Sequence, residues 1–505
     1  MSATAASLRA VSGLLRLDWL APAAITLAAA FIYMNGAFFS SVSALHVDLS
    51  INFTAAHTMR EGQNPYGEEA LLERARELKS PPDLGGPEPF IYQTLFTSYI
   101  QPPVSALLLL PITVLDWREA TRLYLLANNT LLLGAAALTL VTVRPTVPMR
   151  WAIAGAAVIV AFYSQVYGSF ALGQVDASIA FLLALGLWGY SRGRPAVAGG
   201  AIALGTAIKL IPVLLLAYFL WKREYRFAVW GLAIGAALFL VSLPLAGVDT
   251  YWTYITETVP ALMKGSTHYA NISISGVYNR LFAGDDFGGA LGPLLTLEEV
   301  PSRSGARLLG AVTMLALLGL TAAVAGRQRR PREQSAPGAQ TYVLEYYLVV
   351  AVSLLASSVT WEFYVVWLLP LFLAAFLAPE KVLPGPRSLR AGAAAVLVAC
   401  YIALNYPGDH YLFDVNSVFY HPEWVPGIVV EDVVDLYPLP PWLGGHLSLV
   451  PPIRLAALSL LAAVLAALVV LSRRQAGPAF DGDGGAPPEA RKAAELPRPG
   501  AFPRV

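Results

Sequence analysis

The chain carries little charge and almost no cysteine for its length. Only 13% of its 505 residues are charged, and Cys400 is its single cysteine. One cysteine excludes a disulfide framework and a thiolate-rich metal site. The net charge of +1 gives no sign of a nucleic-acid partner. No Walker loop or dinucleotide fingerprint is present, which argues against ATP or a cytosolic nucleotide sugar as a substrate.

Apolar residues are abundant instead. They make up 56% of the chain and the mean hydropathy is +0.57, too high for an average soluble domain. Several apolar runs approach the roughly 20 residues that a helix needs to cross a bilayer, and they are too continuous for barrel strands. We therefore expect an all-α polytopic membrane protein with eleven to thirteen spans. The runs are 19–40, 118–142, 151–171, 225–246, 305–325, 342–360, 361–379, 388–406 and 452–472.

Loop charge predicts how the chain is oriented. Arg9 and Arg16 precede the first run, which is long enough to be an uncleaved signal anchor. Stretches 41–101, 248–303 and 407–451 are acid-rich and contain all six histidines, whereas several other loops are rich in Lys and Arg. We expect these three stretches to be extracytoplasmic loops that hold the chemistry.

This orientation divides the chain into three parts. Residues 1–18 form a cytoplasmic N-terminus, 19–472 a membrane-embedded domain, and 473–505 a disordered cytoplasmic tail rich in Pro, Gly and Ala. Two places leave the span count open. Stretch 103–115 is only half a bilayer long, and the pair 195–208 and 212–221 reads as two short helices or one kinked helix.

The first of the three loops contains a candidate catalytic carboxylate. In "VDLSINFTAAHTMR", Leu49, Phe53 and Ala56 share one helical face, and "EEALLERARELK" repeats that pattern after the turn "GQNPYG". We expect both helices to lie along the membrane surface, with Asp48 close to it. Asp48 then has two possible roles. It can cap the helix that begins at Leu49, or it can act as a base beside a lipid head group.

Several segments, taken in order, resemble glycosyltransferase family 87 of the C-type superfamily. They are "VDLSINFTAAHTMREGQNPYG", "QPPVSALLLLPITVL", "GQVDASIAFLLALGLW" with its following Lys-x-x-Pro segment, and "SSVTWEFYVVWLLP". The family comprises polyprenol-phosphate-mannose-dependent mannosyltransferases and related arabinofuranosyltransferases. The resemblance covers most of residues 40–380 and implies the C-type glycosyltransferase fold. The departures are Gln101 for Tyr, Asp176 for Asn, and Glu362-Phe363 where an acidic or polar residue and His are common.

The resemblance implies transfer of a sugar from polyprenyl phosphate to a glycolipid or glycan hydroxyl at the bilayer, with Asp48 as general base. Such chemistry needs a cation for the leaving phosphate, and the candidates are Lys209, Arg280 and His268. Lys209 is the first choice because an ammonium in an apolar segment faces a cavity or a partner in most cases; snorkelling is its alternative. Arg280 also reads as an ordinary solvated loop residue.

Further polar and aromatic residues are candidates for holding sugar or acceptor. Helix capping is the alternative for the acidic members, and a membrane-interface aromatic belt is the alternative for the aromatic ones. No cluster of His and carboxylate residues has metal-ligand spacing, so neither a metal nor a cofactor is expected. The candidates are His57, Tyr66, Gln174, Asp176, Trp361, Glu362 and Tyr364.

Two other functions fit a polytopic chain. A transporter or flippase of lipid-linked sugars is one, but the two halves do not match and few ionisable residues lie within spans. A catalytically inactive glycan-binding relative is the other. The sequence names neither the sugar nor the acceptor; mannose is favoured by resemblance alone, and loops 248–303 and 407–451 are expected to choose the acceptor. We expect a plasma-membrane protein with an extracytoplasmic active site.

Overall fold

The protein is helical throughout the part of the chain that the structure describes. The computed structural model describes residues 17–39, 41, 46–78, 99–266, 270–283, 304–327, 341–405 and 441–475. Within these ranges, one isolated antiparallel bridge pairs Asn271 with Trp361, in the loops before α17 and η6. The expected all-α polytopic architecture is confirmed.

Among the described residues, six helices are long and apolar enough to cross a membrane. They are α2 (Leu17–Tyr33) with its continuation η1 (Met34–Phe39), α8 (Trp117–Val143), α14 (Tyr225–Ala246), α18 (Ser304–Ala325), α22 (Arg387–Leu404) and α26 (Pro441–Gln475). The pair α9 (Met149–Ala161) and α10 (Ser164–Ala171), bent by 57°, makes a seventh if it is one span. The expected eleven to thirteen spans stay a prediction.

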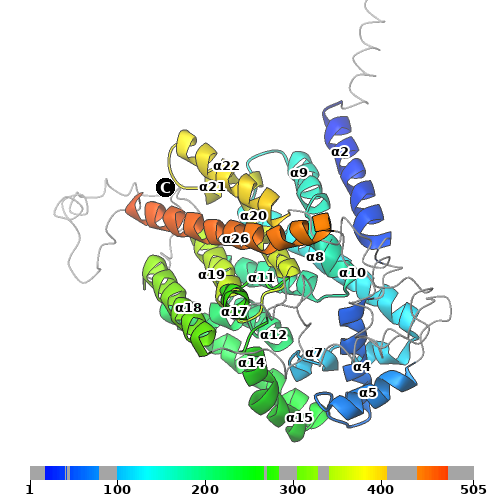
Figure 1. The fold of residues 1–505 in the computed structure, drawn as a ribbon. Helices are drawn as coiled ribbons and strands as arrows, with labels where there is room; N and C mark the ends of the chain where they lie inside the picture. Colours follow the sequence, from blue (N-terminus) through cyan, green and yellow to red (C-terminus); the bar gives the residue numbers. More distant parts are fainter. Residues whose placement is uncertain are drawn as a thin grey trace, which may run out of the picture.

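Shorter apolar helices fill the centre of the molecule. Figure 1 shows α11 and α19 in the middle of the bundle, with the long α26 running across it. Helix α11 packs against α8 and α12, α12 against α14, and α19 against α26. The shorter helices are α11 (Asp176–Ser191), α12 (Pro195–Ile208), α13 (Val213–Trp221), α19 (Thr341–Ala356), the 3-10 helix η6 (Glu362–Leu368) and α20 (Leu369–Leu377); α21 (Pro379–Val382) links α20 to α22.

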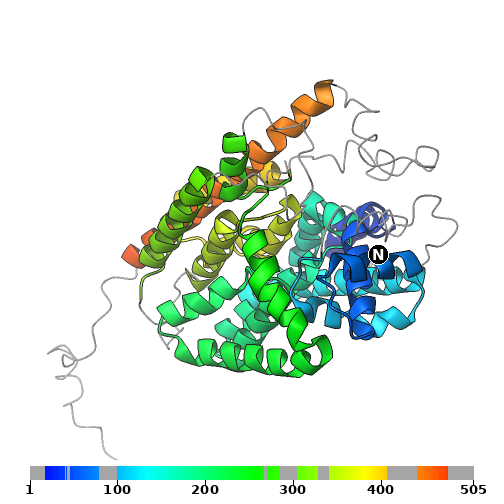
Figure 2. The ribbon, with the colours of Figure 1, turned by 60° about the horizontal axis from the view of Figure 1, so that its bottom comes forward.

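A group of short helices gathers at one end of the bundle, the lower part of Figure 1, and Figure 2 brings that end forward. Most of them come from the two predicted loops 41–101 and 248–303. They are α4 (Val47–Arg60), α5 (Glu68–Glu77), α7 (Pro103–Leu107), η3 (Leu110–Val114), α15 (Val248–Thr253), η4 (Tyr254–Thr258) and α16 (Val259–Leu262). Helix α17 (Ile274–Ala283), from the second of these loops, packs against α18 nearer the middle of the bundle.

The structure resolves both ambiguous stretches. Stretch 103–115 forms α7 and η3, which are too short to span. The segment 195–221 forms two helices, α12 and α13, which end and restart around Lys209 and Pro212. Helix α26 extends from Pro441 to Gln475, and its span candidate, Pro452–Gln475, corresponds to the expected run 452–472. The division into N-terminus, membrane domain and tail stays a prediction. Residues 476–505 lie outside the described part of the chain.

Helix α4 is buried by neighbouring helices, and its expected position along the membrane surface stays a prediction. Nearly all its described side chains are shielded from solvent, with Arg60 as the exposed exception. The reason is that α5, α7 and η3 pack around it. Helix α5 shows the expected amphipathic pattern, because Leu71 and Ala75 are buried and its glutamates are largely exposed.

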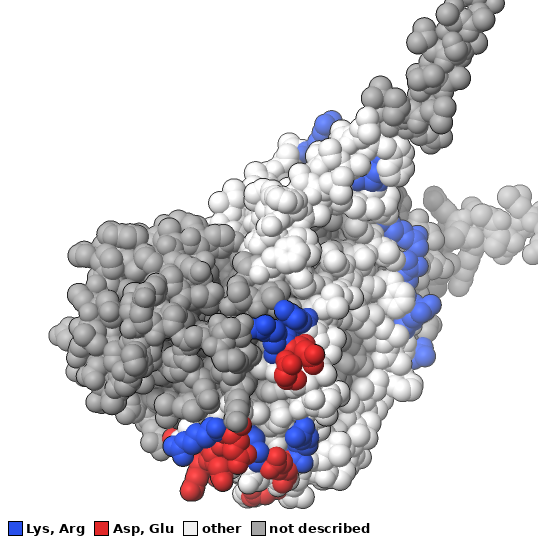
Figure 3. All heavy atoms as spheres, turned by 90° about the vertical axis from the view of Figure 1, so that its right-hand side faces the viewer, with Lys and Arg blue, Asp and Glu red and all other residues white. Residues whose placement is uncertain are grey.

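Acidic side chains gather at one end of the surface, where Lys and Arg side chains lie among them. On the face drawn in Figure 3, the acidic side chains gather in the lower half, the end that holds α4, α5 and α15 in Figure 1, and a broad uncharged area lies above them. This distribution agrees with a band of lipid contact between two polar ends. Which end faces the cytoplasm stays a prediction.

Candidate functional site

The first turn of α4 is fastened to the turn between α10 and α11. The Asp48 backbone N–H donates to the Leu172 carbonyl at 2.9 Å. His46, in a left-handed conformation (φ 49°), precedes the helix, and its Nδ1 lies 3.0 Å from the Phe170 carbonyl. Burial lowers the pKa of His46 to about 4. The ring is therefore neutral near pH 7, and Nδ1, which faces an acceptor, bears the proton.

A glycine makes this close approach possible. Gly173 has φ +71°, and a Cβ at this position would lie 2.5 Å from the Leu49 Cβ. The Tyr124 hydroxyl donates to the Gly173 carbonyl at 3.0 Å and fixes the turn from the other side. Only glycine suits both the left-handed backbone and the contact. The turn thus brings Asp48 next to Gln174.

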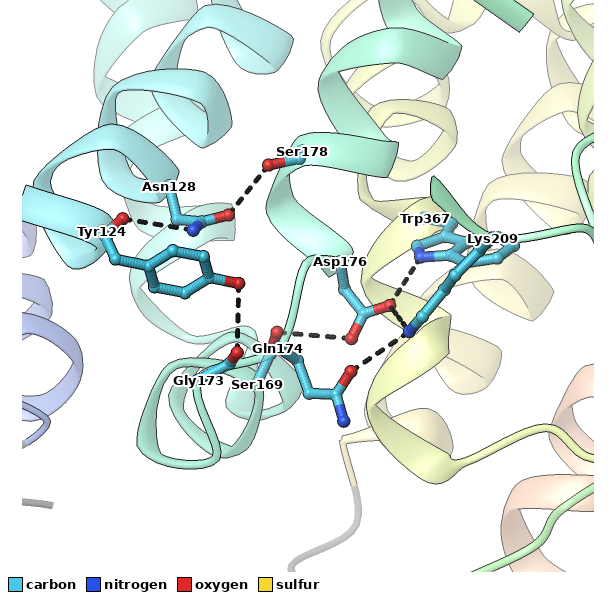
Figure 4. A network of polar contacts seen from close by, with 9 residues as sticks. All are labelled: Tyr124, Asn128, Ser169, Gly173, Gln174, Asp176, Ser178, Lys209 and Trp367. Carbon is cyan, nitrogen blue, oxygen red and sulfur yellow. Dashed lines mark hydrogen bonds and ion pairs between the residues drawn. The ribbon is translucent and has the colours of Figure 1, made fainter. Parts of the chain in front are cut away.

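A buried ion pair lies beside this turn (Figure 4). Lys209 Nζ is 3.1 Å from Asp176 Oδ1 and 3.1 Å from Gln174 Oε1. It also lies 3.6 Å from the centre of the Tyr364 ring, a cation–π distance. Trp367 Nε1–H donates to the same Asp176 oxygen at 2.9 Å. We call Asp48, Gln174, Asp176 and Lys209, with Tyr364 and Trp367, the Lys209 cluster.

Local structure explains why these side chains meet. Lys209 ends α12 in an extended conformation, so its side chain leaves the helix where α12 stops. Asp176 is in the first turn of α11. In η6, Tyr364 and Trp367 are three residues apart, and in a 3-10 helix such residues lie on one side. Their rings stack with centroids 5.3 Å apart and planes 5° from parallel.

Asp48 belongs to the same electrostatic environment. It is half-buried, and burial raises the pKa of its carboxyl to about 6. A hydrogen bond from Gln174 and the positive charge of Lys209 oppose the rise, whereas the charge of Asp176 adds to it. The Gln174 oxygen faces Lys209 in Figure 4 and its nitrogen points away, so this amide is placed to connect the ammonium with Asp48.

The capping interpretations of the three carboxylates are wrong. The N-caps of α4, α11 and η6 are His46, Val175 and Trp361, and none of these helices has a side-chain cap bond. Asp48, Asp176 and Glu362 are first-turn residues, and the side chain of each has a partner from outside its own helix. The snorkelling interpretation of Lys209 is wrong as well, because the residue is 4% exposed and its ammonium binds protein groups.

Glu362 has a partner that the sequence analysis missed. It forms an ion pair with Arg454 of α26, and both side chains are almost fully buried. Arg454 lies within the run assigned as the last span, where an unpaired charge is costly. Its presence in that run could therefore have predicted a buried acidic partner. Trp367, also missed, looks like any other aromatic residue in an apolar segment.

Arg280, the second cation candidate, lies beside the bridge between Asn271 and Trp361. Trp361 is bridged to Asn271, and Arg280 of α17 donates to the Asn271 carbonyl at 2.9 Å. Arg280 is half-buried, and burial lowers its pKa to about 10, so the guanidinium stays charged at neutral pH. It is therefore not an ordinary solvated loop residue. His268 lies outside the described residues.

Two candidates lie in other clusters. His57, nine residues after Asp48 on α4, packs edge-on against Phe53 with ring centroids 4.6 Å apart. Tyr66 donates to the Gln101 carbonyl at 2.6 Å, and its ring lies 5.2 Å from Tyr99. The structure therefore gives both residues packing contacts away from the Lys209 cluster.

The arrangement favours proton transfer at Asp48. Lysine has three donors, and the Asp176 oxygen, the Gln174 oxygen and the Tyr364 ring face those of Lys209. The ammonium balances one of two carboxylates, which leaves the other, Asp48, as an acceptor with a pKa near neutrality. Within the described residues, no group of three or more His, Cys, Asp or Glu side chains is placed to hold a metal ion.

Comparison with known proteins identifies the family. A family model described as glycosyltransferase family 87 matches residues 99–358, a range that includes Gln174, Asp176 and Lys209 but not Asp48. A curated relative from Mycobacterium tuberculosis is 26% identical over 338 residues, 64% of this chain and 68% of the relative. That relative is a polyprenol-phosphate-mannose-dependent alpha-(1-2)-phosphatidylinositol mannoside mannosyltransferase. Because the family match covers more than half of the chain, this protein belongs to glycosyltransferase family 87 and is a polytopic membrane glycosyltransferase.

Proposed function

We propose that the protein transfers a sugar, with mannose favoured, from a polyprenyl-phosphate donor to a hydroxyl of a lipid-linked or cell-envelope glycan. The reaction takes place at the extracytoplasmic face of the plasma membrane, and Asp48 is the general base. The observation that supports this proposal most directly is the half-buried Asp48 carboxylate held beside Gln174 and within the field of Lys209.

The proposed reaction is a direct displacement at the anomeric carbon. The acceptor hydroxyl oxygen forms the new bond to that carbon while its proton moves to Asp48. The bond from the anomeric carbon to the phosphate oxygen breaks, and polyprenyl phosphate leaves with the electron pair. A positioned carboxylate typically contributes about 10²–10⁴-fold in such a step. A pKa of about 6 leaves Asp48 ionised at pH 7 and still basic enough to accept a proton.

Cations near the site stabilise the charge that develops on the phosphate. Lys209 supplies one, although its contacts with Asp176 and Gln174 also make it the residue that holds the site together. Arg280 supplies a second from α17. Phe363, where the family commonly has His, is buried against Tyr364, so this position provides no charge for the donor.

The printed name of the relative supports a lipid-borne donor and a glycolipid acceptor. That protein depends on polyprenol-phosphate-mannose and acts on a phosphatidylinositol mannoside. In this chain, a base at the end of the bundle where acidic side chains gather suits substrates whose reactive groups lie at the bilayer boundary. The proposed substrates need neither a metal nor a cofactor.

The decisive experiment compares the native protein with Asp48→Asn in membranes supplied with a panel of polyprenyl-phosphate sugars. We expect transfer from one donor, and a decrease of about 10²–10⁴-fold in the variant because the amide cannot accept the proton. Glu257→Gln, which alters an exposed carboxylate on η4, is the matched control and should retain transfer. Unchanged transfer by Asp48→Asn would remove Asp48 from the mechanism. Absence of transfer from every donor by the native protein would contradict the proposed donor class.

A further inference from the structure

A helical segment follows the span α14 directly and has three different sides. Gly247, with φ +87°, ends α14, and α15, η4 and α16 then continue from Val248 to Leu262. One side faces the protein, where Thr250, Tyr254 and Thr258 are buried. The other two sides are exposed and differ in chemistry.

One exposed side is apolar along its whole length. Val248 is 69% exposed, Trp252 67%, Ile255 60% and Met263 69%. Their spacing, with the half-buried Val259 between the last two, follows the three-to-four residue repeat of a single helical stripe. The other exposed side is polar and consists of Asp249, Thr256 and Glu257.

We propose that the segment 248–263 lies in the boundary of the lipid bilayer, with this apolar stripe among the acyl chains. A helix with an apolar face and a polar face typically takes this position. The stripe also continues a surface that faces lipid, because Leu240, Val241 and Leu245 at the end of α14 are 65%, 67% and 58% exposed on a candidate membrane span. We therefore expect lipid acyl chains to cover the stripe.

The segment also holds the loop that contains Asp48. On its protein-facing side the Tyr254 and Tyr66 rings lie 5.5 Å apart. At the edge of its polar side Asn64 Nδ2 donates to Asp249 Oδ2 at 2.8 Å and to Thr253 Oγ1 at 3.0 Å. Tyr66 and Asn64 belong to the turn that follows α4. The segment thus links the bilayer to this turn and sets the height of the base above the lipid, a consequence that rests on the proposed function.

The position of the segment can be measured without any activity assay. Cys400 is buried and is the single cysteine, so a Cys400→Ala background accepts one new cysteine at a time. Nitroxide labels at Trp252→Cys and Ile255→Cys, in protein reconstituted in phospholipid vesicles, report collisions with oxygen, which concentrates in lipid, and with a water-soluble nickel chelate. Labels at Thr256→Cys and Glu257→Cys, on the polar side, are the matched controls.

We expect the ratio of oxygen to chelate accessibility to be several-fold higher at 252 and 255 than at 256 and 257. Equal ratios at all four positions would place the segment in water and overturn the proposal. Exclusion of both reagents at 252 and 255 would also overturn it, because it would show that a protein surface, such as a second copy of the chain, covers the stripe. Neither result depends on whether the protein transfers mannose.

Discussion

Two buried ion clusters lie in this bundle, and they differ in how their charges balance. In the Lys209 cluster, two carboxylates, Asp48 and Asp176, share one ammonium. The second cluster consists of Glu345, Lys222, Arg473 and Tyr218, and we call it the Glu345 cluster. Its charge balance is the opposite, because one carboxylate contacts two cations. Glu345 lies 2.9 Å from Lys222 Nζ and 2.7 Å from an Arg473 nitrogen, and it accepts a hydrogen bond from the Tyr218 hydroxyl at 2.9 Å.

The difference separates a reactive site from a structural one. In the Glu345 cluster every group named has a partner, and the contacts fasten α13, α19 and α26 together. In the Lys209 cluster the second carboxylate is left half-buried with a raised pKa. A surplus of acid in a partly desolvated place gives a group that exchanges a proton near neutral pH, whereas matched charges give a rigid joint.

Removing one cation from each cluster should show the largest contrast. Lys209→Met leaves Asp176 buried without its charge partner, which costs about 3–5 kcal/mol of stability. Lys222→Met should cost less, about 1–3 kcal/mol, because Glu345 keeps Arg473 and Tyr218. Thermal unfolding midpoints of the purified variants in detergent measure both. Equal losses would show that the two clusters are equivalent in charge balance.

Two glycines allow a smaller test of the docking of α4. Gly173 and Gly193 both have positive φ, +71° and +63°, so alanine strains the backbone by about 1 kcal/mol or more at either position. A Cβ at Gly193 meets nothing within 4 Å, whereas one at Gly173 overlaps Leu49 and pushes α4 away. We expect Gly173→Ala to lower the rate of sugar transfer at least tenfold more than Gly193→Ala does. Similar rates in both would mean that the contact with Leu49 does not position Asp48.

The pH dependence of transfer should give the smallest effect. Burial raises the pKa of Asp48 to about 6, so its basic form is present above that pH and is lost as the pH falls. We expect kcat/KM to decrease about tenfold per pH unit below pH 6, with an acid limb near that value. Glu345→Gln should keep this limb, because the Glu345 cluster takes no part in proton transfer. A limb near pH 4, the ordinary carboxyl range, would contradict the burial of Asp48.

Part of the site was predictable from the cost of placing charge in an apolar chain. Asp48, Lys209 and Asp176 stood out because each interrupts or borders an apolar run, and the structure brings all three together. Their contacts were not predictable. Local rules assigned the carboxylates to helix caps, but partners from distant helices engage them instead. Trp367 gave no signal, since its role depends on the nearby Asp176.

By itself, the sequence determined the class of the protein, because long apolar runs have no stable alternative to helices in a membrane, whatever their packing. It also identified charged residues in apolar segments, which need a partner because burying a charge is costly. The tertiary structure alone decided which of them meet, that α4 is enclosed by its neighbours, and that the ion pair of Lys209 is with Asp176, while Asp48 has no ion pair within the described residues. These outcomes depend on close approaches between segments more than a hundred residues apart, such as the contact of Gly173 with Leu49, and no local pattern encodes such distances.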